Sequence, residues 1–269
     1  PEQWAAAAAK TLRENDHDAG VMGYAPRVTN ITPERPPILV VCADSLDYLR
    51  SLPPTSVDVI VTDPPYAATG TASSYVTRDK VRGIPREYQF YEAWLRELLV
   101  EFVRVLKPTG AIFLTLDWRG AMALDRATAR FPLSEPKVGV WHRKGLGMGH
   151  VLRNVYECFA VVTCADWERR LTAEPDVWEI PWSTGNRQHG HSAEKPVELF
   201  RRALRLLAAP GAVVLDPFAG SGTSGLAALE EGMSAILVER EPDFAEVARA
   251  RVAAAHECVR LARTAPGST

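Results

Sequence analysis

The hydrophobic positions of this chain follow two periods that alternate along most of its length. Short apolar runs rich in β-branched residues, such as Val57–Thr62, predict buried strands, whereas amphipathic stretches such as Tyr91–Leu106 predict helices. The other predicted strands are Ile38–Ala43, Ala111–Leu116, Lys137–His142, Val155–Cys164, Ala212–Asp216 and Ala235–Glu239. The other predicted helices are Ser45–Ser51, Gly120–Arg130, Glu194–Leu207, Ser221–Glu231 and Pro242–Val259.

This rhythm indicates an α/β fold, with a mostly parallel sheet and helices on both of its faces. Lys137–His142 and Val155–Cys164 are joined by the basic, glycine-rich segment Arg143–Arg153, so we expect them to form an antiparallel end of the sheet. Residues 1–36 combine an alanine-rich run with prolines, which predicts a short helix and an arm. The last residues, Thr264–Thr269, predict a disordered tail.

The composition limits the possible classes of protein but does not indicate a function. With 269 residues, of which 46% are hydrophobic and 24% charged, the chain is long enough for one large α/β domain. It has neither an apolar stretch of about 18 residues nor the features of a signal peptide, so we expect a cytoplasmic protein with no membrane partner. Its four cysteines are scattered without metal or redox spacing, and we expect no metal site. A net charge of −2 means that contacts with nucleic acid would require local basic clusters.

A glycine-rich loop follows the predicted strand Ala212–Asp216. Residues Asp216–Thr223 read Asp-Pro-Phe-Ala-Gly-Ser-Gly-Thr, and Gly220, Gly222 and Gly225 have the spacing of the dinucleotide fingerprint. Glu239 ends the next predicted strand, where an acid that binds ribose is expected. The loop therefore predicts a nucleoside cofactor, and a glycine turn that serves only helix packing is the structural alternative.

Charge indicates which nucleoside the loop binds. Asp216 would repel a pyrophosphate but suits the ammonium and sulfonium groups of S-adenosyl-L-methionine. No lysine follows the loop in the position that a nucleoside triphosphate site of the Walker type requires. A nicotinamide-dependent oxidoreductase that uses the glycine spacing remains the alternative from another class of enzyme.

A second loop, Asp63-Pro64-Pro65-Tyr66, follows the predicted strand Val57–Thr62. Two successive prolines fix φ and remove two backbone donors, so the turn is rigid and presents carbonyl acceptors. Asp63 and the Pro64 carbonyl can accept both hydrogens of an aromatic amine, and the Tyr66 ring can stack on a planar base. A purely structural turn would not require an acid before the prolines and an aromatic residue after them.

Two basic clusters are candidates for contact with nucleic acid. The long loop after Tyr66 has no regular pattern and predicts a binding loop that becomes ordered on DNA. Its basic residues are Arg78, Lys80, Arg82 and Arg86. The second cluster lies between two predicted strands and includes Arg143, Lys144 and Arg153 among glycines, a composition that lets cations and backbone amides reach phosphates. A solvated charged surface is the alternative for each.

Together these motifs resemble the amino-specific DNA methyltransferases of the β group, in which the catalytic half precedes the cofactor half. The resemblance covers roughly residues 38–258 and depends on the order of several elements. These elements are Asp63-Pro64-Pro65-Tyr66, His191-Ser192-Ala193-Glu194-Lys195-Pro196, Leu215–Thr223 and Glu239. It implies a Rossmann-like methyltransferase fold with a seven-stranded, mostly parallel sheet, S-adenosyl-L-methionine as cofactor and double-stranded DNA as partner. A homodimer is a further expectation from the resemblance.

The resemblance also implies roles for individual residues. Asp63, Pro64, Pro65 and Tyr66 correspond to the catalytic loop. Phe218, Gly220 and Gly222 would shape the pocket for the methionine part, Glu239 would bind the ribose hydroxyls, and Asp44 would contact the adenine of the cofactor. Lys195 leads into the helix beside the methionine part. The full set expected to line the cofactor is Asp44, Asp63, Lys195, Asp216, Phe218, Ala219, Gly220, Ser221, Gly222, Thr223 and Glu239.

The expected organisation is an arm (1–36), a catalytic half (37–164), a recognition segment (165–190), a cofactor half (191–262) and a tail (263–269). The recognition segment is short for the β group, which indicates a short or loosely read DNA target and leaves open whether a partner subunit contributes to DNA binding.

The predicted reaction is direct methyl transfer to the exocyclic amine of a flipped base, as in restriction–modification systems. Adenine N6 is the favoured target, because in the family an aspartate at the position of Asp63 accompanies adenine more often than cytosine. The alternatives are cytosine N4, a base in RNA, a protein amide, and a catalytically silent relative that only binds nucleic acid.

Overall fold

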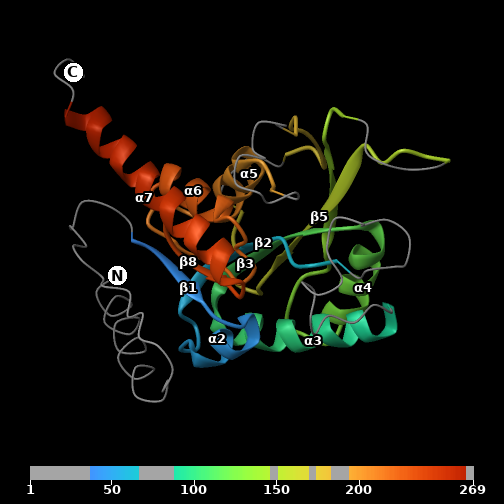
Figure 1. The fold of residues 1–269 in the computed structure, drawn as a ribbon. Coiled ribbons are helices and arrows are strands. Elements are labelled where there is room, and N and C mark those ends of the chain that lie inside the picture. The colour runs from blue at the N-terminus through green and yellow to red at the C-terminus, as the bar shows by residue number, and fades with distance from the viewer. Residues whose placement is uncertain (1–36, 67–87, 146–150, 170–173, 183–193, 265–269) are drawn as a thin grey trace.

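The structure, a computed structural model, describes residues 37–66, 88–145, 151–169, 174–182 and 194–264 (Figure 1). Within these residues, strands and helices alternate from β1 to α7 around a single sheet. The expected N-terminal arm (1–36) and the end of the expected tail (265–269) lie outside the described residues. No helix in the described part of the chain is long and apolar enough to cross a membrane.

The sheet has eight strands in the order β1-β8-β7-β2-β3-β5-β4-β6. Its strands are β1 (Ile38–Cys42), β2 (Val57–Thr62), β3 (Leu106–Leu116), β4 (Lys137–His142), β5 (Tyr156–Thr163), β6 (Val177–Glu179), β7 (Val213–Asp216) and β8 (Ser234–Glu239). All neighbouring strands are parallel except β5, which runs antiparallel to both β3 and β4. The expected antiparallel end of a mostly parallel sheet is therefore confirmed.

The expectation of seven strands is wrong, because β6 adds an eighth strand beside β4. This short strand comes from the segment expected to recognise DNA. Its central residue, Trp178, is 1% exposed and stacks on Phe113 with ring centroids 5.8 Å apart. Burial of this large ring favours a place in the sheet, whereas a run of three residues is too short to show a strand period in the sequence.

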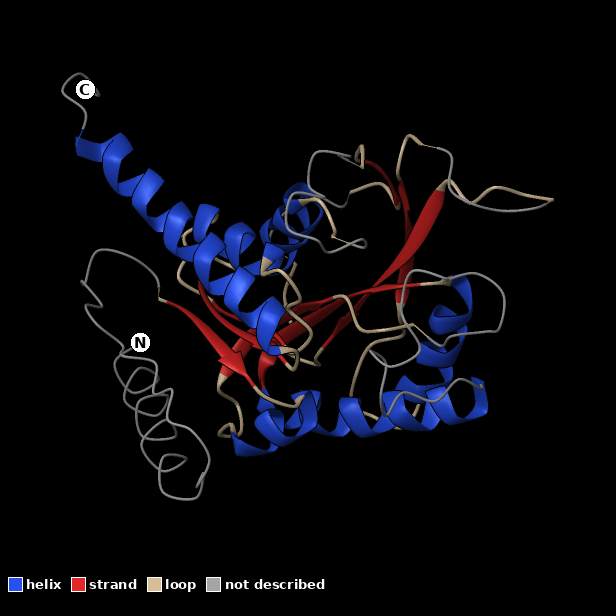
Figure 2. Cartoon of the chain, in the orientation of Figure 1, coloured by secondary structure: helices blue, strands red, loops and turns tan. Residues whose placement is uncertain are grey.

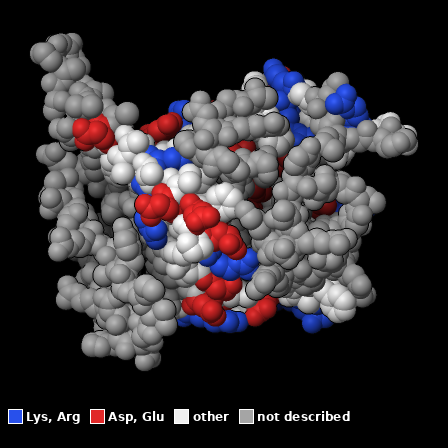
Figure 3. All heavy atoms as spheres, viewed as in Figure 1, with Lys and Arg blue, Asp and Glu red and all other residues white. Residues whose placement is uncertain are grey.

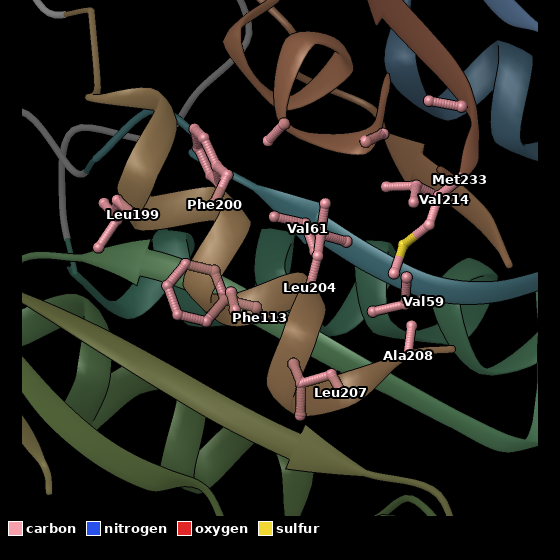
Figure 4. Packing of buried hydrophobic residues seen from close by; sticks show 14 of the residues in the cluster. Val59, Val61, Phe113, Leu199, Phe200, Leu204, Leu207, Ala208, Val214 and Met233 are labelled. Carbon is pink, nitrogen blue, oxygen red and sulfur yellow. The ribbon is translucent and has the colours of Figure 1, made fainter. Parts of the chain in front are cut away.

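Helices cover both faces of the sheet (Figures 1 and 2). They are α2 (Ser45–Ser51), α3 (Tyr88–Val105), α4 (Trp118–Thr128), α5 (Val197–Leu207), α6 (Thr223–Glu230) and α7 (Pro242–Thr264). Alternate residues of β2 supply the two cores: Val59 and Val61 pack with α5, α6 and α7, and Ile60 packs with α2, α3 and α4. Figure 4 shows the first core, where Leu204 of α5 lies against Val59 and Val61.

Helix α5 begins at Val197 and not at the expected Glu194. Pro196 is its N-cap, with an extended backbone at φ −66° and ψ 140°. A proline also disfavours helical backbone in the residue before it, which explains the later start. Glu194 and Lys195 therefore precede the helix and have no regular secondary structure.

Other bounds differ from the expected ones for local reasons. Helix α4 begins at Trp118 because the Asp117 carboxylate accepts a hydrogen bond from the Gly120 amide at 2.6 Å and caps the helix. Helix α3 begins at Tyr88, before the expected Tyr91, and β3 follows it directly. Helix α7 continues past the expected Val259 to Thr264. None of these differences moves a motif to another element.

Candidate active site

The two motif loops lie side by side because the strands that carry them are neighbours. Strands β2 and β7 are parallel, with Val59 opposite Val214 and Ile60 opposite Leu215. Parallel strands end at the same edge, so Asp63 after β2 and the glycine loop after β7 meet there, as ligand sites of open α/β sheets do. The Thr62 hydroxyl links the strands by donating to Asp216 Oδ1 at 2.6 Å.

Asp216 organises the glycine loop from inside the protein. Only 2% of it is exposed, and its carboxylate accepts from the Ser224 hydroxyl and, at 3.0 Å, from the Phe218 amide. Burial raises the pKa of Asp216 to about 6, although these hydrogen bonds and that from Thr62 oppose the rise. Because this pKa lies near neutrality, binding of a cation close by would favour the ionised form of Asp216.

The glycines of the loop serve two physical purposes. Gly220 and Gly222 have φ of 52° and 83°, a region that glycine adopts readily. A Cβ on Gly222 would lie 2.9 Å from Ala248 Cβ, and one on Gly225 would lie 2.5 Å from Leu237 Cδ1. The first and second glycines therefore allow the turn, while Gly222 and Gly225 also allow α7 and β8 to pack closely against α6.

Two acids border the glycine loop at the ends of β8 and β1. Glu239 accepts from the Gly220 amide at 2.9 Å and from the Glu241 amide at 2.8 Å, so its carboxylate is fixed beside the loop. Asp44 is the N-cap of α2 and accepts from the Leu46 amide at 2.9 Å. A carboxylate has about four acceptor positions, so both acids keep positions for ligand hydroxyl or amine donors.

Asp63 lies at the centre of a compact polar cluster at the same edge. Its Oδ1 accepts from the Thr115 hydroxyl of β3 and lies 3.0 Å from the Tyr66 hydroxyl. Its Oδ2 lies 2.7 Å from Lys195 Nζ. Lys195, which follows Asp63 by 132 positions, thus contacts the Asp63–Tyr66 loop, and its ammonium also lies 5.4 Å from the centre of the Tyr66 ring.

The cluster contains a second carboxylate, Glu157 of β5, which the sequence did not identify. Glu157 Oε2 lies 3.0 Å from the Tyr66 hydroxyl and 3.3 Å from Lys195 Nζ. Because β5 runs antiparallel to β3, its first residues lie at the edge where β2 and β3 end. A polar residue at the start of the predicted strand Val155–Cys164 was the only indication in the sequence.

The charged groups of the cluster shift the pKa values of their neighbours. Burial alone would lower the pKa of Lys195, but the neighbouring Asp63 and Glu157 carboxylates outweigh it and raise that pKa. Burial, together with the same two carboxylates, raises the pKa of Tyr66 well above its ordinary value. Lys195 is therefore an ammonium and Tyr66 a neutral phenol at physiological pH.

A buried ion pair holds the Lys195 segment against the glycine loop. Arg251 of α7 lies 2.5 Å from Glu194 Oε1, with 12% and 2% of the two side chains exposed. The same guanidinium donates to the Ser221 carbonyl and hydroxyl at 2.8 Å each. The sequence analysis included Glu194 in a motif without assigning it a role and did not identify Arg251. Their pairing joins the residue before Lys195 to the glycine loop.

Helix α3, on the face of the sheet that α2 and α4 also cover, contacts both the Asp63–Tyr66 loop and the glycine loop. The Tyr91 hydroxyl donates to the Pro65 carbonyl at 3.2 Å. Trp94, nearly one helical turn later, packs on Phe218 with ring centroids 5.8 Å apart. Phe218 therefore contributes to the core beside the glycine loop, and α3 fixes the two loops relative to each other.

The predicted basic residues differ in their surroundings. The Arg143 guanidinium lies 3.2 Å from Glu157 Oε1 and over the Trp182 ring at 5.1 Å, with 11% of the side chain exposed. Lys144 is half-exposed and pairs with Glu179 at 2.8 Å, and Arg153 lies on the surface. Figure 3 shows Lys and Arg side chains at the upper right, where the β4–β5 connection lies in Figure 1. Arg78, Lys80, Arg82 and Arg86 lie outside the described residues.

The residues at this edge fit S-adenosyl-L-methionine. The loop offers glycine backbone and no lysine, and it is flanked by the Asp216 and Glu239 carboxylates. This set of acceptors favours a cation with ribose hydroxyls and disfavours a pyrophosphate. Asp63 lies at the end of the adjacent strand, so an acceptor for an amine is next to the cofactor loop.

Comparison with known proteins agrees with this geometry. The family model described as DNA methylase matches residues 137–250. The type II methyltransferase M2.DpnII of Streptococcus pneumoniae is 24% identical over 260 residues, which cover 82% of this chain and 91% of that protein.

Solved structures share the fold at low sequence identity. The M1.HpyAVI–SAM complex has a TM-score of 0.60 at 18% identity and covers 80% of this chain and 98% of its own. The cytosine-N4-specific PvuII DNA methyltransferase has a TM-score of 0.63 at 17% identity, covering 84% and 95%.

Fold and edge chemistry together define an S-adenosylmethionine-dependent methyltransferase. The order of the motifs and the match to the DNA methylase model identify it more narrowly as a DNA methyltransferase that is similar to the amino-specific enzymes of the β group. The expectations of a Rossmann-like fold, of this cofactor and of a DNA substrate are thus confirmed.

Proposed function

We propose that this enzyme methylates N6 of adenine in double-stranded DNA after flipping the base out of the helix. The observation that carries the proposal is the position of Asp63, a carboxylate at the end of β2 directly beside the glycine loop after β7. Asp63 and the Pro64 carbonyl would accept the two hydrogens of the adenine amine, and the Tyr66 ring would stack on the base.

The chemistry requires little of the protein beyond orientation and charge. When bound, S-adenosylmethionine supplies an electrophilic methyl group on its sulfonium. Asp63 directs the amine lone pair toward that group and stabilises the positive charge that the nitrogen gains during attack. Neither a metal nor a covalent enzyme intermediate enters this proposal.

The cofactor residues have distinct proposed roles. Glu239 would bind the ribose hydroxyls, Asp44 would contact the cofactor adenine, and Phe218 with Gly220 and Gly222 would border the methionine part. The fixed Glu239 carboxylate beside the Gly220 amide supports the first role. Lys195 and Asp216 would act through their charge, and Ala219, Ser221 and Thr223 complete the loop.

For DNA, we propose phosphate contacts by Arg78, Lys80, Arg82 and Arg86, and by Lys144 and Arg153 at the β4–β5 connection. Arg143 would support this surface from within, given its contacts with Glu157 and Trp182. Residues 165–190 would read the target sequence. A homodimer is a further proposal, which rests on the resemblance to the β group alone. A cytoplasmic location is another, and a bacterial type II methyltransferase is among the relatives.

Cytosine N4 is the alternative target, since its amine presents the same two hydrogens to Asp63 and Pro64. The test is radiolabelled methyl transfer to unmethylated duplex DNA, with RNA and protein as controls, followed by mass identification of the nucleosides. N6-methyladenine supports the proposal. N4-methylcytosine as the sole product would overturn the choice of base, and labelling of RNA or protein alone would overturn DNA as the substrate.

A further inference from the structure

Asp63 must serve two sets of partners if it is to accept the amine of a base. In this structure its carboxylate already contacts the Thr115 and Tyr66 hydroxyls and the Lys195 ammonium. These three donors leave about one of the four acceptor positions of the carboxylate for a hydrogen of the amine. A donor that moves to another acceptor therefore gives the amine freer access to Asp63.

Glu157 is positioned to be that acceptor. Its Oε2 lies 3.0 Å from the Tyr66 hydroxyl, the same distance that separates this hydroxyl from Asp63 Oδ1. Tyr66 has a single hydroxyl hydrogen, so it donates to one of the two carboxylates at a time. Lys195 Nζ likewise lies between them, 2.7 Å from Asp63 Oδ2 and 3.3 Å from Glu157 Oε2.

The other oxygen of Glu157 contacts a basic residue. Oε1 lies 3.2 Å from Arg143 Nη1, and the Arg143 guanidinium covers the ring of Trp182, which belongs to the proposed recognition segment. The Arg143 backbone carbonyl also accepts from the Trp182 amide at 3.1 Å. Glu157 thus contacts both the catalytic loop and the elements that lead to the DNA surface.

We propose that Glu157 is a positioning residue for methyl transfer: it takes over the Tyr66 hydroxyl and the Lys195 ammonium, so that Asp63 can accept the target amine. The exchange moves hydrogen bonds only. No proton or covalent bond is transferred, and two carboxylates remain balanced by Lys195 and Arg143 before and after it. This inference rests on the proposed roles of Asp63 and Tyr66.

The test compares Glu157→Gln with wild type in methyl transfer under saturating cofactor. Glutamine keeps the shape but loses the charge that attracts Lys195 away from Asp63. We expect kcat to fall about tenfold or more, as loss of a charge-assisted hydrogen bond implies, while cofactor Kd and DNA KM change by less than about twofold. Unchanged kcat would overturn the proposal.

A double-mutant cycle separates positioning from a general loss of structure. If Glu157 acts through the Tyr66 hydroxyl, Glu157→Gln should lower kcat less in a Tyr66→Phe background than in wild type. If the double variant loses kcat by the product of the two single fold-losses, the residues act independently, and the proposed exchange is contradicted. If Glu157→Gln fails to fold, Glu157→Asp tests the same geometry by withdrawing the carboxylate, and wild-type kcat in that variant would equally overturn it.

Glu231→Gln is the matched control. Glu231 has the same 15% side-chain exposure as Glu157 and pairs with Arg201 and Arg205, far from the catalytic loop in the chain and outside the cluster. We expect it to lower thermal stability without lowering kcat, and a kcat loss equal to that of Glu157→Gln would contradict a specific role. Wild type in the same assay separates this inference from the proposed function. A wild type that is inactive, or that methylates only cytosine, would overturn the proposed function. An active wild type with an unimpaired Glu157→Gln variant would overturn this inference alone.

Discussion

The Thr62 hydroxyl donates to the Asp216 carboxylate at 2.6 Å and joins the strand before the catalytic loop to the strand before the glycine loop. The two residues are 154 positions apart in the sequence. This bond constrains the distance between the proposed amine acceptor Asp63, which follows Thr62, and the loop that begins at Asp216. Methyl transfer depends on that distance, since donor and acceptor must be held in line.

Cofactor binding should depend on pH through Asp216, whose pKa burial raises to about 6. Below this pH the acid is protonated in the free enzyme, and a cationic ligand must displace the proton. We expect the affinity for S-adenosylmethionine to fall by up to about tenfold per pH unit below the pKa and to level off above it. Calorimetry between about pH 5 and pH 8 measures the Kd of S-adenosylmethionine at each pH.

S-adenosylhomocysteine, which lacks the sulfonium charge, should show a shallower dependence, and Asp216→Asn should flatten the profile for both ligands. Identical slopes for the two ligands in wild type would show that Asp216 does not respond to the sulfonium.

Gly222→Ala should destabilise the protein by about 1–3 kcal/mol, through the φ of 83° and the close approach to Ala248. Gly211→Ala is the control, because Gly211 has φ 84° but a Cβ added there would meet no neighbouring atom within 4 Å among the residues that the structure describes. Thermal unfolding should show the larger decrease in Tm for Gly222→Ala. Equal decreases would mean that packing against α7 contributes nothing at this position.

Asp63→Asn should reduce kcat by about a hundredfold or more, because the developing positive charge on the amine loses its carboxylate. Asp58→Asn is a matched control, because Asp58 lies on β2, the strand that Asp63 directly follows. Asp58 is 27% exposed against 24% for Asp63, and each pairs with a lysine at 2.7 Å. Methyl-transfer assays should find the large loss only for Asp63→Asn, and a similar loss in both variants would point to β2 stability instead.

Arg251→Leu should destabilise the fold by about 3–5 kcal/mol, since it leaves the buried Glu194 carboxylate without its cation. Adding Glu194→Leu should recover part of that loss. Arg249→Leu on the same helix breaks an exposed pair with Glu246 and should cost about 0–1 kcal/mol. Urea unfolding measures all three, and a double variant no more stable than Arg251→Leu would contradict the buried-charge explanation.

Reversal of Arg78, Lys80 and Arg82 to glutamate should weaken DNA binding and reduce its dependence on salt, because fewer counterions are released when fewer phosphates are contacted. Cofactor binding should change little. Fluorescence anisotropy at several salt concentrations gives the slope. A slope equal to that of wild type would show that these charges do not contact phosphate.

The sequence by itself determined the class of the protein. Strand and helix periods predicted the α/β sheet, and Asp63–Tyr66, the glycine loop and Glu239 indicated amine methylation with a nucleoside cofactor. These features are local: a strand that ends in two prolines, or a turn that requires glycines, leaves its mark within a few residues. Their order along the chain then indicated the family.

Tertiary structure alone decided which side chains surround Asp63. Lys195 contacts it from the residues before α5, which begins after Pro196, and Glu157 joins the same cluster from the first residues of β5, which runs antiparallel to β3. The eighth strand depends on burial of Trp178 against Phe113. Such contacts join residues far apart in the chain, and burial and charge pairing across the sheet select them, so no local pattern records them.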